Sequence, residues 1–199
     1  MAPARGAFVV VIGPDGVGKT SLAARLIADC GAPTMYLHFR PRLWTPPPSS
    51  PIEAGIPPPK QNDPGPRPLG WLRLARSVGV FWLGYLRWIR PALARGTLVV
   101  GDRWVYGYVG QPVALGFGGP PWLARLATRI APHPDLVVRL TAPAEIVAKR
   151  KSDLTAAEIQ MEIEKWETLP LDVWVLDSSM DVSSLADAVA ARLARTTRG

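Results

Sequence analysis

The chain has 199 residues, of which 48% are hydrophobic and 20% are charged, enough apolar content to bury the core of a folded domain. Its single cysteine, Cys30, excludes an intrachain disulfide framework, and no stretch approaches the roughly 20 apolar residues of a membrane-spanning helix. The formal net charge is +7 and the sequence pI is about 10.1, which favours an anionic partner. We expect one soluble, cytoplasmic domain over residues 1–199.

Apolar runs alternate with helical patterns along the chain. We expect strands at 7–12, 34–39, 97–101, 135–140 and 173–176, and helices at 21–30, 69–94, 120–130, 145–151, 155–169 and 183–194. The first run is continuous and rich in valine, which is typical of a strand buried on both faces. Pro91 is expected to break or kink the long helix, and Thr155 with Glu158 forms a capping-box pattern. The alternation predicts an α/β fold with a parallel sheet covered on both faces.

One segment breaks this alternation. Residues 41–68 contain 11 of the chain's 22 prolines and show almost no periodicity. So much proline excludes a helix or a central strand there, and we interpret the segment as an insertion. It is either an ordered flap over a site or a mobile loop.

A phosphate-binding motif follows the first predicted strand. Gly13-Pro-Asp-Gly-Val-Gly-Lys19-Thr20 fits G-x-x-x-x-G-K-[ST] and lies between a buried strand and a helix, the context of a P-loop. Glycines let backbone N–H groups surround phosphates, the lysine reaches the β- and γ-phosphates, and the threonine binds Mg²⁺. The sequence therefore predicts ATP or GTP binding. The residues expected to hold the nucleotide are Gly13, Asp15, Gly16, Val17, Gly18, Lys19, Thr20 and Ser21.

The third predicted strand ends in an acidic and a basic residue. Asp102 and Arg103 follow Gly101, at the carboxyl end of a strand, where open α/β sheets bind ligands. The carboxylate is suited to hold Mg²⁺ through water or to accept a proton from the acceptor. The planar guanidinium is suited to grip an acceptor phosphate.

The order and spacing of four elements resemble the thymidylate kinase family. They are the P-loop, Ile89-Arg-Pro-Ala-Leu-Ala-Arg-Gly96, Gly101-Asp-Arg-Trp104 and Pro134-Asp-Leu-Val-Val-Arg-Leu140. The resemblance implies the P-loop NTPase fold of nucleoside-monophosphate kinases, a five-stranded parallel sheet with the P-loop strand at its centre. It also implies ATP with Mg²⁺ as donor and a nucleoside-monophosphate-like acceptor.

The resemblance also assigns roles to individual residues. It implies that Asp15 meets the acceptor's sugar hydroxyl, that Arg103 binds the acceptor phosphate, and that Trp104 stands for the aromatic residue after the Asp-Arg pair. Arg40 matches an arginine near the acceptor, and Arg150 matches the arginine that ends the helix before the lid.

The same resemblance places the catalytic cation in a lid at about 149–156. Family members carry a catalytic arginine either in the P-loop or in this lid, and the P-loop position here is Gly16. The lid should therefore supply the charge that phosphoryl transfer needs, from Lys149, Arg150 or Lys151.

The acceptor remains open among several hypotheses. Phe81 is aligned with an arginine that grips the nucleotide acceptor in the family, so a sugar or another hydroxylated metabolite is the alternative to a nucleoside monophosphate, with Phe81 in the acceptor site. A nucleotide-dependent switch without a small acceptor is a second alternative. A membrane-peripheral protein using a helix rich in tryptophan and arginine is a third. We expect no nucleic-acid partner and no membrane contact, and a homodimer is an open possibility.

Overall fold

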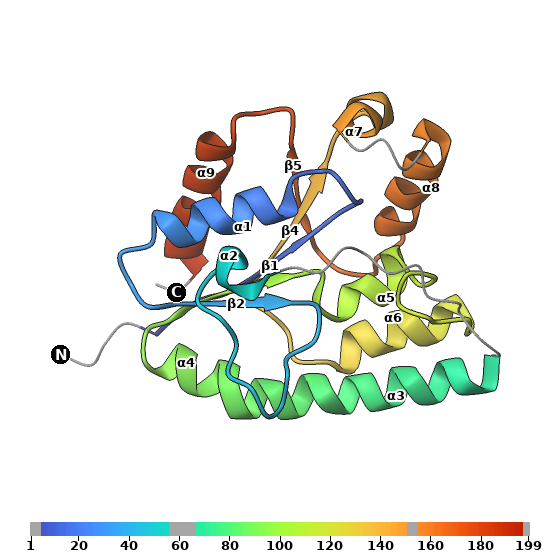
Figure 1. Cartoon of the computed structure of the whole chain (residues 1–199), viewed down its shortest axis with the longest axis horizontal. Coiled ribbons are helices and arrows are strands. Elements are labelled where there is room, and N and C mark those ends of the chain that lie inside the picture. Colours follow the sequence, from blue (N-terminus) through green and yellow to red (C-terminus); the bar gives the residue numbers. More distant parts are fainter. Residues whose placement is uncertain (1–4, 56–66, 151–154, 197–199) are drawn as a thin grey trace.

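A five-stranded parallel sheet forms the centre of the molecule, with strand order β2-β3-β1-β4-β5 (Figure 1). The structure, a computed structural model, describes residues 5–55, 67–150 and 155–196. The strands are β1 (Phe8–Ile12), β2 (Thr34–His38), β3 (Leu98–Asp102), β4 (Leu136–Thr141) and β5 (Trp174–Asp177). All five predicted strands are confirmed, and the P-loop strand β1 is the central one.

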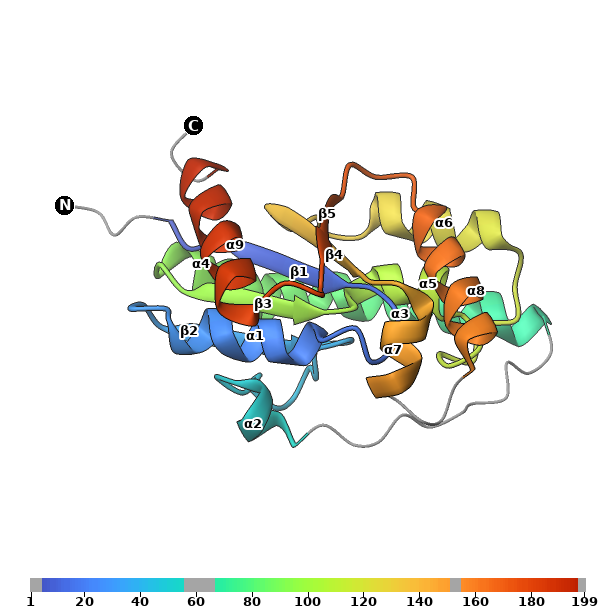
Figure 2. The ribbon, with the colours of Figure 1, turned by 90° about the horizontal axis from the view of Figure 1, so that it is seen from above.

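Helices cover both faces of the sheet, as Figures 1 and 2 show. The main helices are α1 (Lys19–Ala28), α3 (Arg67–Gly84), α4 (Arg90–Ala94), α6 (Pro121–Ile130), α7 (Ala144–Arg150), α8 (Ala156–Glu167) and α9 (Val182–Thr196). Helices α1 and α9 lie together on one face, and α3, α4 and α6 lie on the other. None of the helices in the described part of the chain is long and apolar enough to cross a bilayer.

Strand β1 contributes side chains to two separate hydrophobic cores because its side chains alternate between the faces of the sheet. Val9 and Val11 pack with α1 and α9, whereas Phe8, Val10 and Ile12 pack on the α3 side. All five side chains are buried, which explains why the strand is apolar throughout rather than at every second position.

The described part of the proline-rich segment is ordered against the sheet edge. The N–H of Tyr36 on β2 donates to Pro48 O at 2.8 Å, so residues just before Ser50 pair with the edge strand. The prediction that this segment holds no helix is wrong, because α2 (Pro51–Ala54) forms one turn. Ser50 caps that turn, and proline is tolerated at the first helical position, where its missing N–H has no partner to lose. Residues 56–66 lie outside the described residues.

The predicted kink before Pro91 is confirmed as a change of helix type. A π-helical turn, Tyr85–Ile89, joins α3 to α4. Proline has no N–H for the carbonyl four residues earlier, and a widened turn accommodates this loss. The capping box of α8 is also confirmed, with both hydrogen bonds present between Thr155 and Glu158. The sequence patterns missed the short turns after β3, a 3₁₀ turn (Trp104–Tyr106) and α5 (Gly107–Gly110).

Candidate functional site

The P-loop joins the carboxyl end of β1 to the amino end of α1. Gly13, Gly16 and Gly18 have φ angles of 139°, 85° and 98°, which side chains rarely permit. At Gly13 a Cβ atom would also lie 2.4 Å from Leu140 O on the neighbouring strand, so only glycine fits there. The loop therefore has the glycine-dependent backbone of a phosphate-binding loop, and it leads into the start of α1, where the helix dipole favours an anion.

Lys19 is buried within this loop, with 6% of its surface exposed. Its Nζ atom donates to Gly13 O at 3.0 Å and to Pro14 O at 2.7 Å, and it lies 3.3 Å from Asp15 Oδ1. Burial lowers the pKa of the ammonium below its usual value, although the nearby carboxylates of Asp102 and Asp15 oppose this effect. The Lys19 ammonium is thus held in place by carbonyl and carboxylate oxygens of the loop itself.

Arg103 from the end of β3 reaches the same carboxylate. Its Nη2 atom lies 2.5 Å from Asp15 Oδ1, and both side chains are 14% exposed. The backbones of Arg103 and Trp104 have φ angles of 69° and 48°, uncommon for residues other than glycine. The structure therefore brings together the P-loop and the Asp-Arg pair, with two cations on one acidic side chain.

Asp102 lies beside Arg103 and is 2% exposed. Its Oδ2 atom accepts a hydrogen bond from the Tyr36 hydroxyl at 3.3 Å and lies 3.4 Å from His38 Nδ1, whereas its buried Oδ1 atom has no hydrogen-bond partner among the described residues. Burial opposes ionisation, but the nearby His38 ring and the charges of Lys19 and Arg103 outweigh it and hold the pKa of Asp102 below its usual value. Asp102 therefore combines a lowered pKa with a buried oxygen that no described residue hydrogen-bonds.

Thr20 is close to this carboxylate through a shared neighbour. The Tyr36 hydroxyl donates to Asp102 Oδ2, and Thr20 lies near enough to that hydroxyl to affect its pKa. Thr20 and Asp102 are the two residues that the sequence predicts as Mg²⁺ ligands. A hydroxyl and an ionised carboxylate are oxygen donors of the kind that Mg²⁺ prefers, together with phosphates and water. Within the described ranges no group of three or more His, Cys, Asp or Glu side chains forms a metal cluster. The residues fit a cation that shares its coordination with a phosphate ligand.

Four residues near the site were missed by the sequence analysis. They are Tyr36 and His38 on β2, Gln111 after α5, and Glu162 on α8. Glu162 Oε2 accepts from the Asp15 N–H at 3.1 Å and from Gln111 Nε2 at 3.3 Å, so α8 is tied to the P-loop. The alternation of Tyr36 and His38 on a strand paired with β3 was the one available signal, because it places both side chains on one face.

Two residues predicted to contact the acceptor are core residues instead. Phe81 and Trp104 are both 0% exposed, their ring centroids lie 4.5 Å apart, and Trp104 Nε1 donates to Pro132 O. Neither side chain has surface to offer a ligand, since each is enclosed by the packing of α3 against the sheet. Both belong to the hydrophobic core behind the site.

Arg40 lies beyond the end of β2, at the rim of the site. Its Nη1 atom donates to Ser77 Oγ at 2.9 Å, and its guanidinium lies 5.2 Å from the centre of the Phe39 ring. With His38 it lines a pocket of about 410 Å³ between β2 and the proline-rich segment. His38 lines the same pocket, and its Nδ1 atom lies 3.4 Å from Asp102 Oδ2.

The remaining predicted residues are placed as follows. Gly16, Thr20 and Ser21 are exposed at the start of α1, and the Val17 side chain is fully buried, so only its backbone can face a ligand. Arg150 is the last residue of α7, but its side chain is not described. Lys149 is exposed on α7, and residues 151–154, which are half of the predicted lid at 149–156 and include Lys151, lie outside the described residues.

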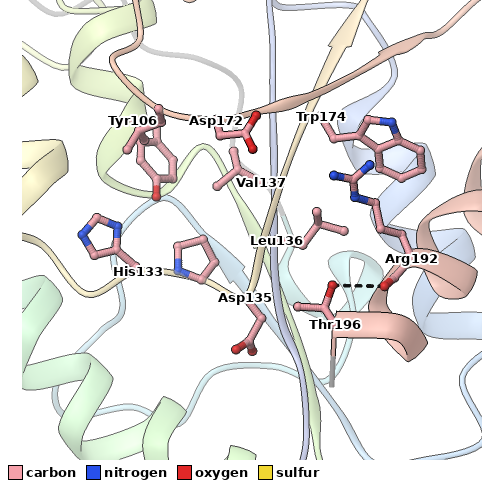
Figure 3. A pocket seen from close by; sticks show the side chains of 11 residues that line it. Tyr106, His133, Asp135, Leu136, Val137, Asp172, Trp174, Arg192 and Thr196 are labelled. Atoms are coloured by element: carbon pink, nitrogen blue, oxygen red, sulfur yellow. Dashed lines mark hydrogen bonds between the residues drawn. The ribbon is translucent and has the colours of Figure 1, made fainter. Parts of the chain in front are cut away.

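A second pocket, of about 240 Å³, opens at the opposite edge of the sheet, near the amino end of β4 (Figure 3). Asp135, Asp172 and Arg192 line it, and Arg192 lies 4.8 Å from the centre of the Trp174 ring. None of the predicted site residues whose side chains are described lines this pocket, because the P-loop follows the carboxyl end of β1 and the strands are parallel.

The strand order and the P-loop after the central strand define the class of this protein as a P-loop fold of the nucleoside-monophosphate-kinase type. No family model matches the chain, and no curated protein matches it by sequence. Among solved structures it is similar to thymidylate kinase from Candida albicans, with a TM-score of 0.64 at 16% identity, over 97% of this chain and 94% of that one. At this identity the similarity shows a shared fold.

Proposed function

We propose that this protein is a phosphotransferase that moves the γ-phosphoryl group of ATP to a small acceptor with the help of Mg²⁺. The observation that carries the proposal is the meeting of Lys19 and Arg103 on Asp15, beside the ionised Asp102, at the amino end of α1. Phosphoryl transfer depends on positioning and on positive charge around the transferred group, and this cluster supplies both.

The donor side consists of the P-loop and α1. Its backbone amides and Lys19 would bind the β- and γ-phosphates, with Lys19 Nζ moving from its acceptors in the loop to phosphate oxygens. Asp102 and Thr20 would hold Mg²⁺, which when bound neutralises charge on the phosphates. The free buried Oδ1 atom of Asp102 supports this assignment.

The acceptor side is defined by Arg103, with Asp15 and Arg40. Arg103 is anchored by Asp15, so its guanidinium is oriented before an acceptor arrives. The acceptor oxygen bonds to the γ-phosphorus while the bond to the β–γ bridging oxygen breaks, which releases ADP. A nucleoside monophosphate is the preferred acceptor, and the Candida albicans enzyme with this fold is described as having broad substrate specificity.

An ATP-consumption screen tests the proposal. The chain is incubated with ATP, Mg²⁺ and panels of nucleoside monophosphates, nucleosides and sugars, and Lys19→Ala serves as the blank. We expect acceptor-dependent ADP release that falls at least about a hundredfold in Lys19→Ala, because the charge on the transferred group is no longer compensated. Lys165→Ala removes an exposed lysine of α8 and should be unchanged. Slow hydrolysis that no acceptor stimulates would point to a nucleotide-dependent switch instead.

A sugar or other neutral acceptor is the second candidate. The observation that favours it is the burial of Phe81 where the resemblance expects a nucleotide-gripping arginine. Arg103→Ala separates the two candidates, with Arg195→Ala as an exposed control. For an acceptor that carries a phosphate, we expect its KM to rise about a hundredfold, as for loss of a charge-assisted hydrogen-bond pair. For a neutral acceptor the KM should change less than about threefold.

A further inference from the structure

Asp102 carries one carboxylate oxygen to which no described residue hydrogen-bonds. The side chain is 2% exposed, and the oxygen in question, Oδ1, is itself buried. A buried oxygen without a partner costs folding free energy, so such an atom in a folded protein marks a place where another group binds. The orientation of the Asp102 carboxylate therefore decides where that group is held.

Two side chains of β2 lie against the other oxygen of this carboxylate. The Tyr36 hydroxyl donates to Asp102 Oδ2 at 3.3 Å, and His38 Nδ1 lies 3.4 Å from the same atom. Strands β2 and β3 are parallel and pair His38 with Asp102, and Tyr36 comes two residues earlier, so both side chains project from the same face of β2. Since both neighbours lie against Oδ2, Oδ1 is the oxygen that is left for a ligand.

The Tyr36 side chain is better fixed than that of His38. Tyr36 is fully buried in the core that α1 and α9 form with the sheet, whereas the His38 side chain is 29% exposed. A tyrosine ring enclosed by a close-packed core keeps its hydroxyl in one place. Phenylalanine would fill nearly the same space, and a buried hydroxyl costs free energy unless it is hydrogen-bonded. Packing alone therefore does not account for a tyrosine at this position.

The same hydroxyl adjoins both predicted Mg²⁺ ligands. Asp102 accepts its hydrogen bond, and Thr20 at the start of α1 is near enough to affect the pKa of Tyr36. The charges of Lys19 and Arg103 act on Asp102 as well, so this carboxylate lies beside the P-loop. Tyr36 thus connects the edge strand β2 to the place where the P-loop, α1 and β3 meet.

We propose that Tyr36 is a positioning residue for Mg²⁺ binding, whose hydroxyl fixes the Asp102 carboxylate so that Oδ1 is presented to the cation. His38 supports the same orientation through its contact with Oδ2. The inference rests on the proposed function, because it takes Asp102 and Thr20 as the residues that hold Mg²⁺ beside a bound nucleotide. Tyr36 acts through Asp102, in the way that hydrogen bonds to a ligating carboxylate strengthen metal binding in other proteins.

Calorimetric titration of the chain with ADP, in the presence of either Mn²⁺ or EDTA, tests this proposal. Mn²⁺ stands in for Mg²⁺, and we expect the unchanged chain to bind ADP more tightly with the metal than without it. Tyr36→Phe removes only the hydroxyl, so the Kd with Mn²⁺ should rise at least about tenfold. The Kd with EDTA should stay within about twofold, because the P-loop is unaltered. His38→Leu should shift the Kd with Mn²⁺ in the same direction by a smaller factor.

Tyr106→Phe is the matched control. Tyr106 is 1% exposed and lines the pocket at the opposite edge of the sheet (Figure 3), so loss of its hydroxyl should leave both Kd values unchanged. Circular dichroism should show that every variant is folded.

Three outcomes would overturn the proposal, and they differ in what they mean for the proposed function. If Tyr36→Phe bound ADP with Mn²⁺ as tightly as the unchanged chain, Tyr36 would have no positioning role, and the proposed function would stand. Equal losses with Mn²⁺ and with EDTA would mean that Tyr36 supports the fold of the whole site rather than the cation. If Mn²⁺ gave the unchanged chain no gain in ADP affinity, the metal assignment in the proposed function would fail, and this inference with it.

Discussion

The donor side and the acceptor side of the candidate site consist of different kinds of side chain. On the donor side, the buried Lys19 bonds to Asp15 within the P-loop, and the buried Asp102 at the end of β3 adds a negative charge that acts on Lys19. On the acceptor side, Phe81 and Trp104 are packed against each other with no exposed surface, and Arg40 stands at the rim.

This difference separates what the fold provides from what determines the substrate. Phosphate binding needs backbone amides and a few charges whose places follow from one short loop after one strand. Acceptor recognition depends on side chains from several elements, and these can change while the core stays filled. Phe81 and Trp104 show such a change, because their packing stabilises the fold at positions where the resemblance expects ligand contacts.

Among the variants that test this difference, Asp102→Asn is expected to have the largest effect on turnover. The substitution removes the buried charge proposed to hold Mg²⁺, so turnover should fall at least about a hundredfold and more Mg²⁺ should be needed for half-maximal rate. Steady-state ADP release over a range of Mg²⁺ concentrations measures both. Asp172→Asn, at an exposed carboxylate, is the control and should behave like the unchanged chain. If Asp102→Asn kept full activity, the donor side would not include this carboxylate.

Asp102→Asn should also change how the stability of the fold depends on pH. The pKa of Asp102 is held below its usual value in the folded chain, so its carboxylate stabilises the fold above the unfolded pKa near 3.8. That contribution is lost as the pH falls through the lower, folded pKa. Thermal melts between neutral and strongly acidic pH should therefore show a weaker acid-induced loss of Tm in Asp102→Asn than in the unchanged chain. An identical pH profile would contradict the assigned pKa direction.

The next largest effect concerns Phe81→Ala on the acceptor side. A completely buried phenylalanine replaced by alanine costs about 3 to 5 kcal/mol of unfolding free energy, from lost burial and the cavity that remains. Urea denaturation followed by fluorescence measures the loss. Leu83→Ala, two residues along the same helix and 56% exposed, should change stability by less than about 0.5 kcal/mol. Equal small losses in both variants would show that Phe81 is not part of the core.

The sequence predicted most of the fold because its strongest signals are local. The apolar run before the P-loop, the capping box at Thr155 and the break at Pro91 each express a physical preference within a few residues. The turn Pro51–Ala54 was missed because a single helical turn has no periodicity, and a proline at its start reads as a helix breaker.

The site was predicted less completely because its remaining contacts join distant parts of the chain. Tyr36 meets Asp102 across 66 residues, and Glu162 meets the Asp15 N–H across 147 residues. No spacing rule reaches that far. Phe81 was misplaced because α3 is apolar on every side at this point, so periodicity does not show which face is buried. In the structure Phe81 points inward while Trp82 and Leu83 are exposed.

The smallest effect is expected from Thr155→Ala, at the start of the helix that ties the two sides together. Helix α8 carries Glu162, which accepts hydrogen bonds from the Asp15 N–H on the donor side and from Gln111 after α5. Loss of the Thr155 cap should cost about 1 kcal/mol. Thr168→Ala at the other end of α8 is the control, since its hydroxyl bonds only within the last turn, and it should cost less.

The pH dependence of the stability lost in Thr155→Ala shows whether the capping box is the cause of that loss. Hydrogen bonds from the Thr155 N–H and hydroxyl lower the pKa of Glu158, so their contribution is present above the unfolded pKa near 4.5 and is lost as the pH falls through the folded value. The gap in Tm between Thr155→Ala and the unchanged chain should therefore narrow in acid. A gap that stays constant down to strongly acidic pH would mean that the capping box does not set the start of α8, and that Glu162 is positioned by packing alone.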